Sequence, residues 1–157
     1  MRVGFLADTH GLLRPQAERA LRGVDLIMHA GDVGDPEILT KLKRIAPVFA
    51  VRGNVDTGPW AQQLPAAAIV HAGGASFCVL HNLRELDLRP DAAKFDFVIS
   101  GRTHVPEQSE RRGVLYLNRG SAGPRRFNLP VTLALLELGK KPWRPRIIRL
   151  LEPVRGE

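Results

Sequence analysis

The 157-residue sequence contains a single cysteine, Cys78, so no disulfide can form within the chain and zinc sites built from several cysteines are excluded. No apolar run approaches the ~20 residues that span a membrane. The apolar start of the chain ends at Asp8, too early for a signal peptide. Aromatic residues make up only 6%, which leaves few surfaces for stacking the bases of single-stranded nucleic acid. We therefore expect a cytoplasmic protein with no membrane partner, folded as one domain over residues 1–157.

Acidic residues are scarce in the last third of the chain. Residues 1–110 hold 12 basic and 13 acidic residues, whereas residues 111–157 hold 11 and 3, so the formal net charge of +7 arises there. Such a region attracts phosphate esters, nucleotides or nucleic acid. A solvated basic surface explains the same pattern, and we favour it over a dedicated nucleic-acid surface.

The hydrophobic pattern predicts strands and helices that alternate in the first half of the chain. Strands are expected over residues 2–7, 24–29 and 47–51, with helices over 15–21 and from Asp35 to about Ile45, where Asp35 is the N-cap and Pro36 the first helical residue. This order predicts a parallel sheet. The second half predicts strands alone, over 67–71, 76–80, 95–100, 114–117, 131–138 and 146–151. We expect an α/β fold of two packed sheets with helices outside.

Potential metal ligands follow five of these strands. They are Asp8 and His10, Asp32, Asn54, His81, and His104 in the segment Gly101-Arg102-Thr103-His104. Each alone is typical of a turn, a helix cap or a polar loop. Together they lie at the carboxyl ends of strands, where α/β sheets bind ligands. Carboxylate and imidazole ligands suit Mn²⁺, Fe²⁺, Zn²⁺ or Ni²⁺.

The ordered set resembles the calcineurin-like metallophosphoesterases. Asp8-Thr9-His10-Gly11, His29-Ala30-Gly31-Asp32 and Arg52-Gly53-Asn54-Val55-Asp56 are similar to the small bacterial phosphodiesterase branch, and residues 117–126 resemble its closing loop. The scaffold subunit of eukaryotic retromer resembles the same branch. The resemblance covers nearly the whole chain and implies a four-layer sandwich of two mixed β-sheets flanked by helices.

The resemblance also implies a metal-dependent phosphodiesterase with one or two divalent ions, Mn²⁺ above all. The first ion would take Asp8, His10, Asp32 and His104. The second would share Asp32 and take Asn54 and His81. A hydroxide between the ions would attack phosphorus in line, because metal ions activate water and neutralise phosphoryl charge. The implied substrate is a phosphodiester small molecule or nucleotide, with nucleic acid less favoured, and a homo-oligomer is compatible with the family.

The largest departure from the family pattern is Arg102, because the family carries a second histidine there. A guanidinium cannot ligate a metal. Three alternatives follow: a weak second metal completed by water, one metal with Arg102 clamping the phosphate, or loss of activity with the fold kept for binding. We favour the first two. Asp32, Asn54 and Arg102 are then the expected catalytic residues, with Asn54 and Arg102 also binding substrate.

Smaller departures concern Val55 and Arg119. Val55 replaces a histidine that acts as general acid in larger family members, which favours activated phosphodiesters or slow turnover. Arg119 replaces a usual proline, and we expect it to add charge near the rim without affecting metal binding. His29 is interpreted either as a partner that orients Asp32 or as a buried structural residue, and Asp56 either orients a ligand or shapes a turn. A non-enzymatic scaffold and a nucleic-acid-processing protein are the competing functions.

Overall fold

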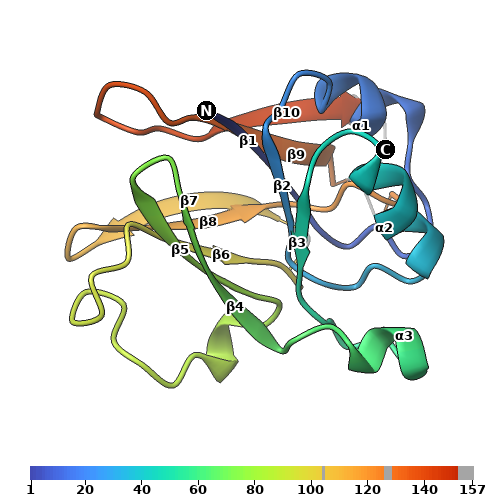
Figure 1. Cartoon of the computed structure of the whole chain (residues 1–157), viewed down its shortest axis with the longest axis horizontal. Helices are drawn as coiled ribbons and strands as arrows, with labels where there is room; N and C mark the ends of the chain where they lie inside the picture. Colours follow the sequence, from blue (N-terminus) through green and yellow to red (C-terminus); the bar gives the residue numbers. More distant parts are fainter. Residues whose placement is uncertain (104, 126–128, 152–157) are drawn as a thin grey trace.

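Two five-stranded sheets make up the body of the computed structural model, which describes residues 1–103, 105–125 and 129–151. Sheet A has the strand order β10-β9-β1-β2-β3 and sheet B the order β4-β5-β6-β8-β7. The strands of sheet A are β1 (Arg2–Leu6), β2 (Leu26–His29), β3 (Val48–Ala50), β9 (Val131–Glu137) and β10 (Arg146–Leu151). Those of sheet B are β4 (Ala67–Ala72), β5 (Ala75–Leu80), β6 (Phe97–Ser100), β7 (Pro106–Arg111) and β8 (Val114–Arg119). Figure 1 shows both sheets with their labels.

Parallel strands joined by helices form the first half of the chain, as the sequence predicts. β1 pairs in parallel with β2, and β2 with β3, while α1 (Pro15–Ala20) and α2 (Pro36–Lys43) connect them. Asp35 caps α2 because its carboxylate accepts a hydrogen bond of 2.8 Å from the backbone N–H of Glu37, and Pro36 occupies the first turn. Both helices bury apolar side chains against the outer face of sheet A.

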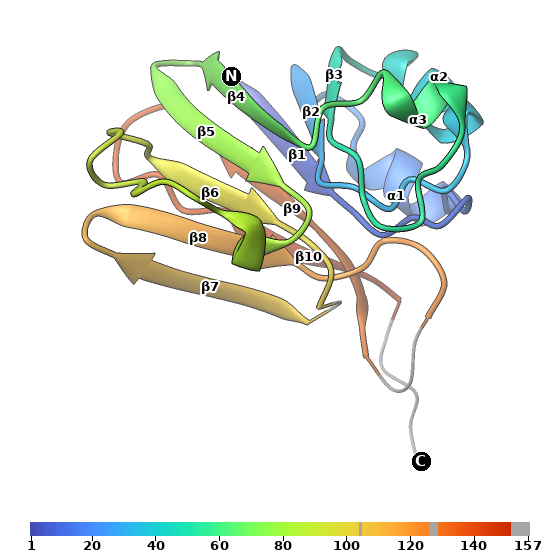
Figure 2. The same cartoon turned by 90° about the horizontal axis from the view of Figure 1, so that it is seen from below.

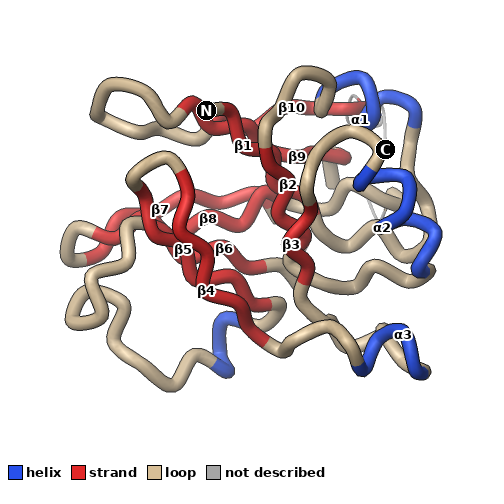
Figure 3. The backbone as a smooth tube through the Cα atoms, in the orientation of Figure 1, coloured by secondary structure: helices blue, strands red, loops and turns tan. Residues whose placement is uncertain are grey.

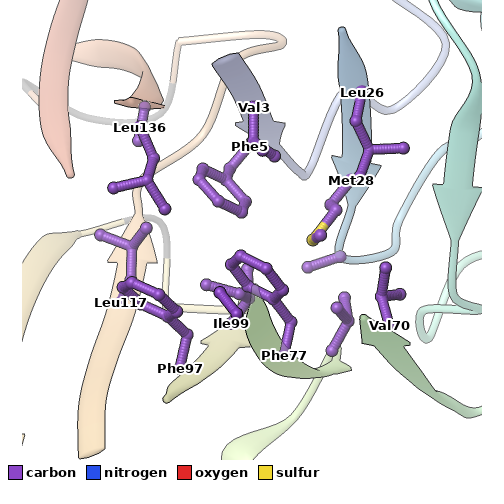
Figure 4. Close-up of a cluster of buried hydrophobic side chains, with 14 of the residues drawn as sticks. Val3, Phe5, Leu26, Met28, Val70, Phe77, Phe97, Ile99, Leu117 and Leu136 are labelled. Carbon is purple, nitrogen blue, oxygen red and sulfur yellow. The ribbon is translucent and has the colours of Figure 1, made fainter. Parts of the chain in front are cut away.

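The two sheets pack face to face over a core of alternating strand residues. Val3 and Phe5 of β1 and Met28 of β2 point at Phe77 of β5 and Phe97 of β6 (Figure 4). The Phe77 and Phe97 rings stack with centroids 4.9 Å apart, and the Phe5 ring lies 6.0 Å from that of Phe77. Each fully buried phenylalanine contributes about 1.5–3 kcal/mol. This core fixes one sheet against the other and brings their strand ends to a common edge.

The outer layers of the sandwich are unequal. Helices α1, α2 and α3 (Pro59–Gln62) lie beside sheet A, as Figures 1 and 2 show. The outer face of sheet B packs against Leu83 and Leu86, in and just after the short 3-10 helix η1 (Leu83–Glu85), and against Phe95. Figure 3 shows that loops form most of the chain between β5 and β6. The predicted fold class, two mixed sheets of an α/β sandwich, is confirmed.

Three described elements are absent from the sequence-based prediction: α3, the 3-10 helix η1 and β7. α3 is only four residues long and gives no periodic signal. β7 has the sequence Pro-Glu-Gln-Ser-Glu-Arg, lies at one edge of sheet B and is exposed along nearly its whole length. Polar residues and a first-position proline are typical of edge strands, which must avoid pairing with other chains. None of the helices in the described ranges is long and apolar enough to cross a membrane.

Candidate metal centre

The loops after β1 and β2 run side by side and place Asp8 and Asp32 together. The backbone N–H of Asp8 donates to the Gly31 carbonyl at 2.9 Å, and that of His10 donates to the Asp32 carbonyl at 3.0 Å. Asp8, His10 and Asp32 all have left-handed backbone conformations, with φ of 56°, 47° and 56°. Such conformations are costly outside glycine and cluster where function requires a fixed side-chain direction.

Asp56 ties the loop after β2 to the loop after β3. Its two carboxylate oxygens accept hydrogen bonds from the backbone N–H groups of Val33 (3.2 Å), Gly34 (2.8 Å) and Gly53 (2.8 Å). The side chain is almost fully buried. Of the two interpretations from the sequence, the structure supports the turn-shaping one, because three backbone groups bracketing the site share this carboxylate.

Four of the predicted ligands converge at the common edge of the two sheets. Nε2 of His81 lies 3.2 Å from Oδ2 of Asp32 and 3.9 Å from Oδ1 of Asp8. Nε2 of His10 lies 3.7 Å from Oδ2 of Asp32 and 4.0 Å from Oδ1 of Asp8. The ligand atoms of Asp8, Asp32 and His81 all lie within 4.8 Å of one another, and these three side chains are buried.

Hydrogen bonds set the direction and charge of two of these groups. Nδ1–H of His81 donates to the Ala30 carbonyl at 2.8 Å, which turns Nε2 toward the carboxylates. Burial alone would lower the pKa of His81, but Asp32 and the Ala30 carbonyl outweigh it and raise that pKa. Burial would likewise raise the pKa of Asp32, yet His81 and the Val55 N–H, 3.0 Å from Oδ1, lower it to about 2. Asp32 is therefore a carboxylate at neutral pH.

His29 supports the backbone of the site rather than the Asp32 side chain. Its Nδ1 accepts the Gly31 N–H at 3.1 Å, so its Nε2 carries the proton and donates to Oγ1 of Thr9 at 3.0 Å. The Thr9 hydroxyl in turn donates a hydrogen bond to the Val33 carbonyl at 2.9 Å. Burial, reinforced by the positive charge of Arg119, lowers the pKa of His29 to about 3. The structure thus assigns His29 the buried structural role.

Arg119 lies beneath the site, and the expectation that it adds charge at the rim is wrong. The side chain is fully buried, and its Nη1 donates to the Ser100 carbonyl. A Cβ placed on Gly101 would lie 3.1 Å from Nδ1 of His81 and 3.2 Å from Nη2 of Arg119, so both nitrogens border that glycine. Burial lowers the pKa of Arg119 to about 10, and the attraction of Asp8 acts in the opposite direction. The guanidinium is therefore a fixed positive charge behind the carboxylates.

The closing loop holds Asp8 and the segment after β6 in place. Oγ of Ser121 donates to the Asp8 carbonyl at 3.1 Å, and the Asn118 side-chain amide donates to the Gly101 carbonyl at 3.0 Å and to Oγ1 of Thr103 at 2.7 Å. A Cβ on Gly123 would come within 2.3 Å of the Thr9 carbonyl oxygen, so only glycine fits there. Within the described part of the segment that resembles a closing loop, Asn118, Ser121 and Gly123 therefore contact the loops that carry the site.

The remaining predicted residues lie at the rim or outside the described ranges. Asn54 is exposed. Its two neighbours contact Asp32: Gly53 packs against it, and the Val55 backbone N–H donates a hydrogen bond to its Oδ1. Arg102 is exposed and has a left-handed backbone with φ of 75°. His104 lies outside the residues that the structure describes. Sequence reasoning missed the support given by Arg119, although Leu115, Leu117 and Arg119 alternate along β8 on its inward face.

The donor set fits a divalent cation. Two buried carboxylates and an imidazole nitrogen converge from three strand ends, which is the combination that first-row divalent metals bind. The Ala30 carbonyl fixes the ring of His81 through its other nitrogen, as carbonyls do for metal-bound histidines in general. The geometry therefore agrees with a metal site built on Asp8, Asp32 and His81, with His10 beside them.

Comparison with known proteins identifies the family. A model of the calcineurin-like phosphoesterase superfamily domain matches residues 1–141. A probable metallophosphoesterase of Methanothermobacter thermautotrophicus is 34% identical over 98% of this chain and 95% of its own. The chain therefore belongs to the calcineurin-like phosphoesterase superfamily and is a hydrolase of the metallophosphoesterase class.

Solved structures agree on the fold. A structure described as that of a novel archaeal phosphodiesterase superimposes with a TM-score of 0.72 at 21% identity, covering 94% of this chain and all of that one. Vps29 of Entamoeba histolytica, solved with Zn²⁺, superimposes with a TM-score of 0.71 at 22% identity, covering 96% of this chain and all of that one. The same fold thus occurs in a phosphodiesterase and in Vps29.

Proposed function

We propose that this protein is a metal-dependent phosphodiesterase acting on small phosphodiesters or nucleotides. The observation that carries the proposal is the convergence of Asp8, Asp32 and His81, whose ligand atoms lie within 4.8 Å of one another at the edge shared by both sheets. The archaeal phosphodiesterase with the same fold supports the diester specificity.

Asp8, His10, Asp32 and His104 would hold the first divalent ion, and Asp32, Asn54 and His81 a second. Mn²⁺ is the preferred candidate, with Fe²⁺, Ni²⁺ and Zn²⁺ as alternatives. A bound ion of this kind lowers the pKa of water and neutralises charge on phosphoryl oxygens. Asp32 and His81 orient the ion-binding atoms through their fixed hydrogen bonds to Val55 and Ala30.

Arg102 distinguishes this site from the family pattern. Because a guanidinium has no lone pair to give to a metal, Arg102 leaves the second ion with three protein ligands. Its exposed position at the rim suits a second role, in which the guanidinium binds a phosphate oxygen of the substrate. Asn54, which is also exposed, would bind the same phosphate through its amide.

The test is Mn²⁺-dependent hydrolysis of bis-p-nitrophenyl phosphate by the wild type, Asp32→Asn and Asp87→Asn. Asp32→Asn keeps the shape of the side chain but loses the carboxylate, so we expect a loss of at least about 100-fold in kcat/KM. Asp87 is an exposed carboxylate that is not part of the Asp8–Asp32–His81 group and serves as the matched control, with wild-type activity expected. Hydrolysis that survives in Asp32→Asn would refute the proposed site.

A binding scaffold is the second candidate, favoured by Arg102 and by the likeness to Vps29. Arg102→His separates the two functions when it is assayed beside the wild type and when Mn²⁺ stoichiometry is measured by titration calorimetry. An active wild type supports the enzyme with an altered second site. Activity restricted to Arg102→His, with a gain of bound metal, would favour the scaffold instead.

A further inference from the structure

A pocket of about 560 Å³ lies on the outer face of sheet B. Its floor is formed by outward-facing positions of β6 and β8, and its walls by the start of η1 on one side and edge strand β7 on the other. The described residues that form it include Arg84, Ser100, Arg102, Glu107, Arg111 and Tyr116. Its volume falls in the range of about 300–1,000 Å³ that is typical of small-molecule sites.

The pocket adjoins the candidate metal centre. His81 is followed directly by Asn82, which lines the pocket, and the Gly101 N–H donates to the His81 carbonyl at 2.9 Å. Gly101 therefore borders His81 on one side and the pocket on the other. Arg102 lies at this junction. A substrate whose phosphorus sits at the metal centre can extend one substituent into the pocket past Arg102.

The described lining is strongly basic. It contains three arginines, Arg84, Arg102 and Arg111, against a single acid, Glu107. All three arginines are exposed, so their charges face solvent and any ligand that enters. Guanidinium groups bind phosphate and carboxylate groups in a bidentate manner. The lining therefore favours a ligand with an anionic group.

An aromatic surface accompanies the arginines. Tyr116 is half-buried on the outward face of β8, and the Arg111 guanidinium lies 4.8 Å from the centre of its ring. A paired arginine and aromatic ring offers planar surface and positive charge in one place, the combination that stacks on and holds a nucleobase. Tyr116 is also the only tyrosine of the chain, which makes it a specific reporter.

We propose that this pocket is a substrate subsite that binds a nucleotide substituent of the phosphodiester. The base lies against the Arg111–Tyr116 pair, and a phosphate of the substituent contacts Arg84. Arg102 contacts the same ligand at the junction with the metal centre. The inference rests on the proposed phosphodiesterase activity for its biological meaning, but nucleotide binding is measurable without any hydrolysis.

The experiment titrates protein carrying ¹³C-labelled tyrosine with ADP and follows the ring resonances of Tyr116 by NMR. One titration is done in EDTA, without metal, and a second in Zn²⁺, which is used in place of Mn²⁺ because it is diamagnetic. We expect a saturable shift with ADP in both conditions. Adenosine, which lacks the phosphates, should bind at least about 10-fold more weakly because the charge-assisted hydrogen bonds are lost. Inorganic phosphate, which lacks the base, should leave the ring resonances nearly unchanged.

Variants locate the site. Arg84→Gln should weaken ADP binding by about 10-fold. Arg89→Gln is the matched control, because Arg89 is an exposed arginine near η1 that bonds Asp91 at 3.0 Å and does not line the pocket. Its ADP affinity should equal that of the wild type. Equal weakening in both variants would show nonspecific attraction to the basic surface and overturn the proposal.

Failure of this inference differs from failure of the proposed function. If bis-p-nitrophenyl phosphate is hydrolysed but ADP leaves Tyr116 unshifted, the enzyme stands and the nucleotide subsite is refuted. If ADP binds with the expected dependence on Arg84 but no phosphodiester is hydrolysed, the pocket stands as a nucleotide site and the catalytic proposal is refuted.

Discussion

Gly53 offers the sharpest test of how the carboxylates are placed. A Cβ at this position would lie 2.2 Å from both the backbone nitrogen and Oδ1 of Asp32. The φ of Gly53 lies outside the left-handed range, so the effect expected for Gly53→Ala is one of contact. The substitution adds a single methyl group against a proposed metal ligand.

The size of the effect follows from the overlap. Cβ contacts become ordinary only from about 3.4 Å, so Asp32 has to move by about 1 Å to accept the methyl group. A shift of that size is large beside the 3.2 Å contact between Oδ2 and Nε2 of His81, so we expect that contact to change. A misplacement of about 1 Å in a catalytic site costs on the order of 100-fold in rate, which corresponds to about 2.7 kcal/mol. We expect a loss of that size in kcat/KM together with weaker Mn²⁺ binding.

The assay measures Mn²⁺ affinity by titration calorimetry, hydrolysis of bis-p-nitrophenyl phosphate, and the melting temperature. Gly139→Ala is the matched control, because no atom lies within 4 Å of its added Cβ. It should keep wild-type metal binding and activity and be as stable as the wild type or slightly more so. If a folded Gly53→Ala protein binds Mn²⁺ as tightly as the wild type, the proposed role of Asp32 as a tightly placed ligand is wrong.

Three further predictions concern stability and metal binding. Asp56→Ala removes an acceptor shared by three backbone N–H groups, so the free energy of unfolding should fall by about 3–5 kcal/mol in urea titrations. The loss should be smaller in Asp56→Asn, which keeps one acceptor oxygen, and equal losses would contradict the hydrogen-bond argument. Because the pKa of His29 is lowered in the native state, the unfolded chain binds a proton at His29 between pH 6.5 and about 3 that the native state does not. The contribution of His29 to stability is therefore complete above pH 6.5 and is lost as the pH falls. His29→Gln should flatten the pH dependence of chemical unfolding over that range, and an unchanged slope would count against this assignment. Mn²⁺ at 100 times its Kd should stabilise the wild type by about 2.7 kcal/mol, which raises the melting temperature by roughly 5–10 °C, and EDTA should reverse the rise. A similar rise in Asp32→Asn would show that the metal binds elsewhere.

Local patterns were sufficient for every strand except β7 and for the gathering of Asp8, Asp32 and His81. Asp8, Asp32 and His81 each follow an apolar strand, and the carboxyl ends of parallel strands meet at one edge, so chain order alone predicted that they gather. The N-cap at Asp35 was predicted for the same reason, because its signal lies within a few residues of the helix that it starts.

Features that depend on three-dimensional packing were harder to predict. Asp56 accepts hydrogen bonds from backbone N–H groups 22 and 23 residues away, and no local sequence pattern predicts such partners. Arginine is usually exposed, so the burial of Arg119 contradicted its residue type, even though its place two residues after Leu117 indicates an inward direction. β7 gave no signal because its residues are polar or charged and almost all exposed, so it has no apolar alternation.

Arg119 has a consequence for the order in which the protein matures. Buried carboxylates without a counter-charge oppose folding, and many acidic metal sites therefore remain unfolded until the ion arrives. Here the guanidinium attracts Asp8 from within the protein, so part of the compensating charge is carried by the chain itself. We therefore expect that the polypeptide folds first and binds a metal ion afterwards. Loss of metal in the cell would then inactivate the protein without destroying it, and the emptied molecule could be reloaded.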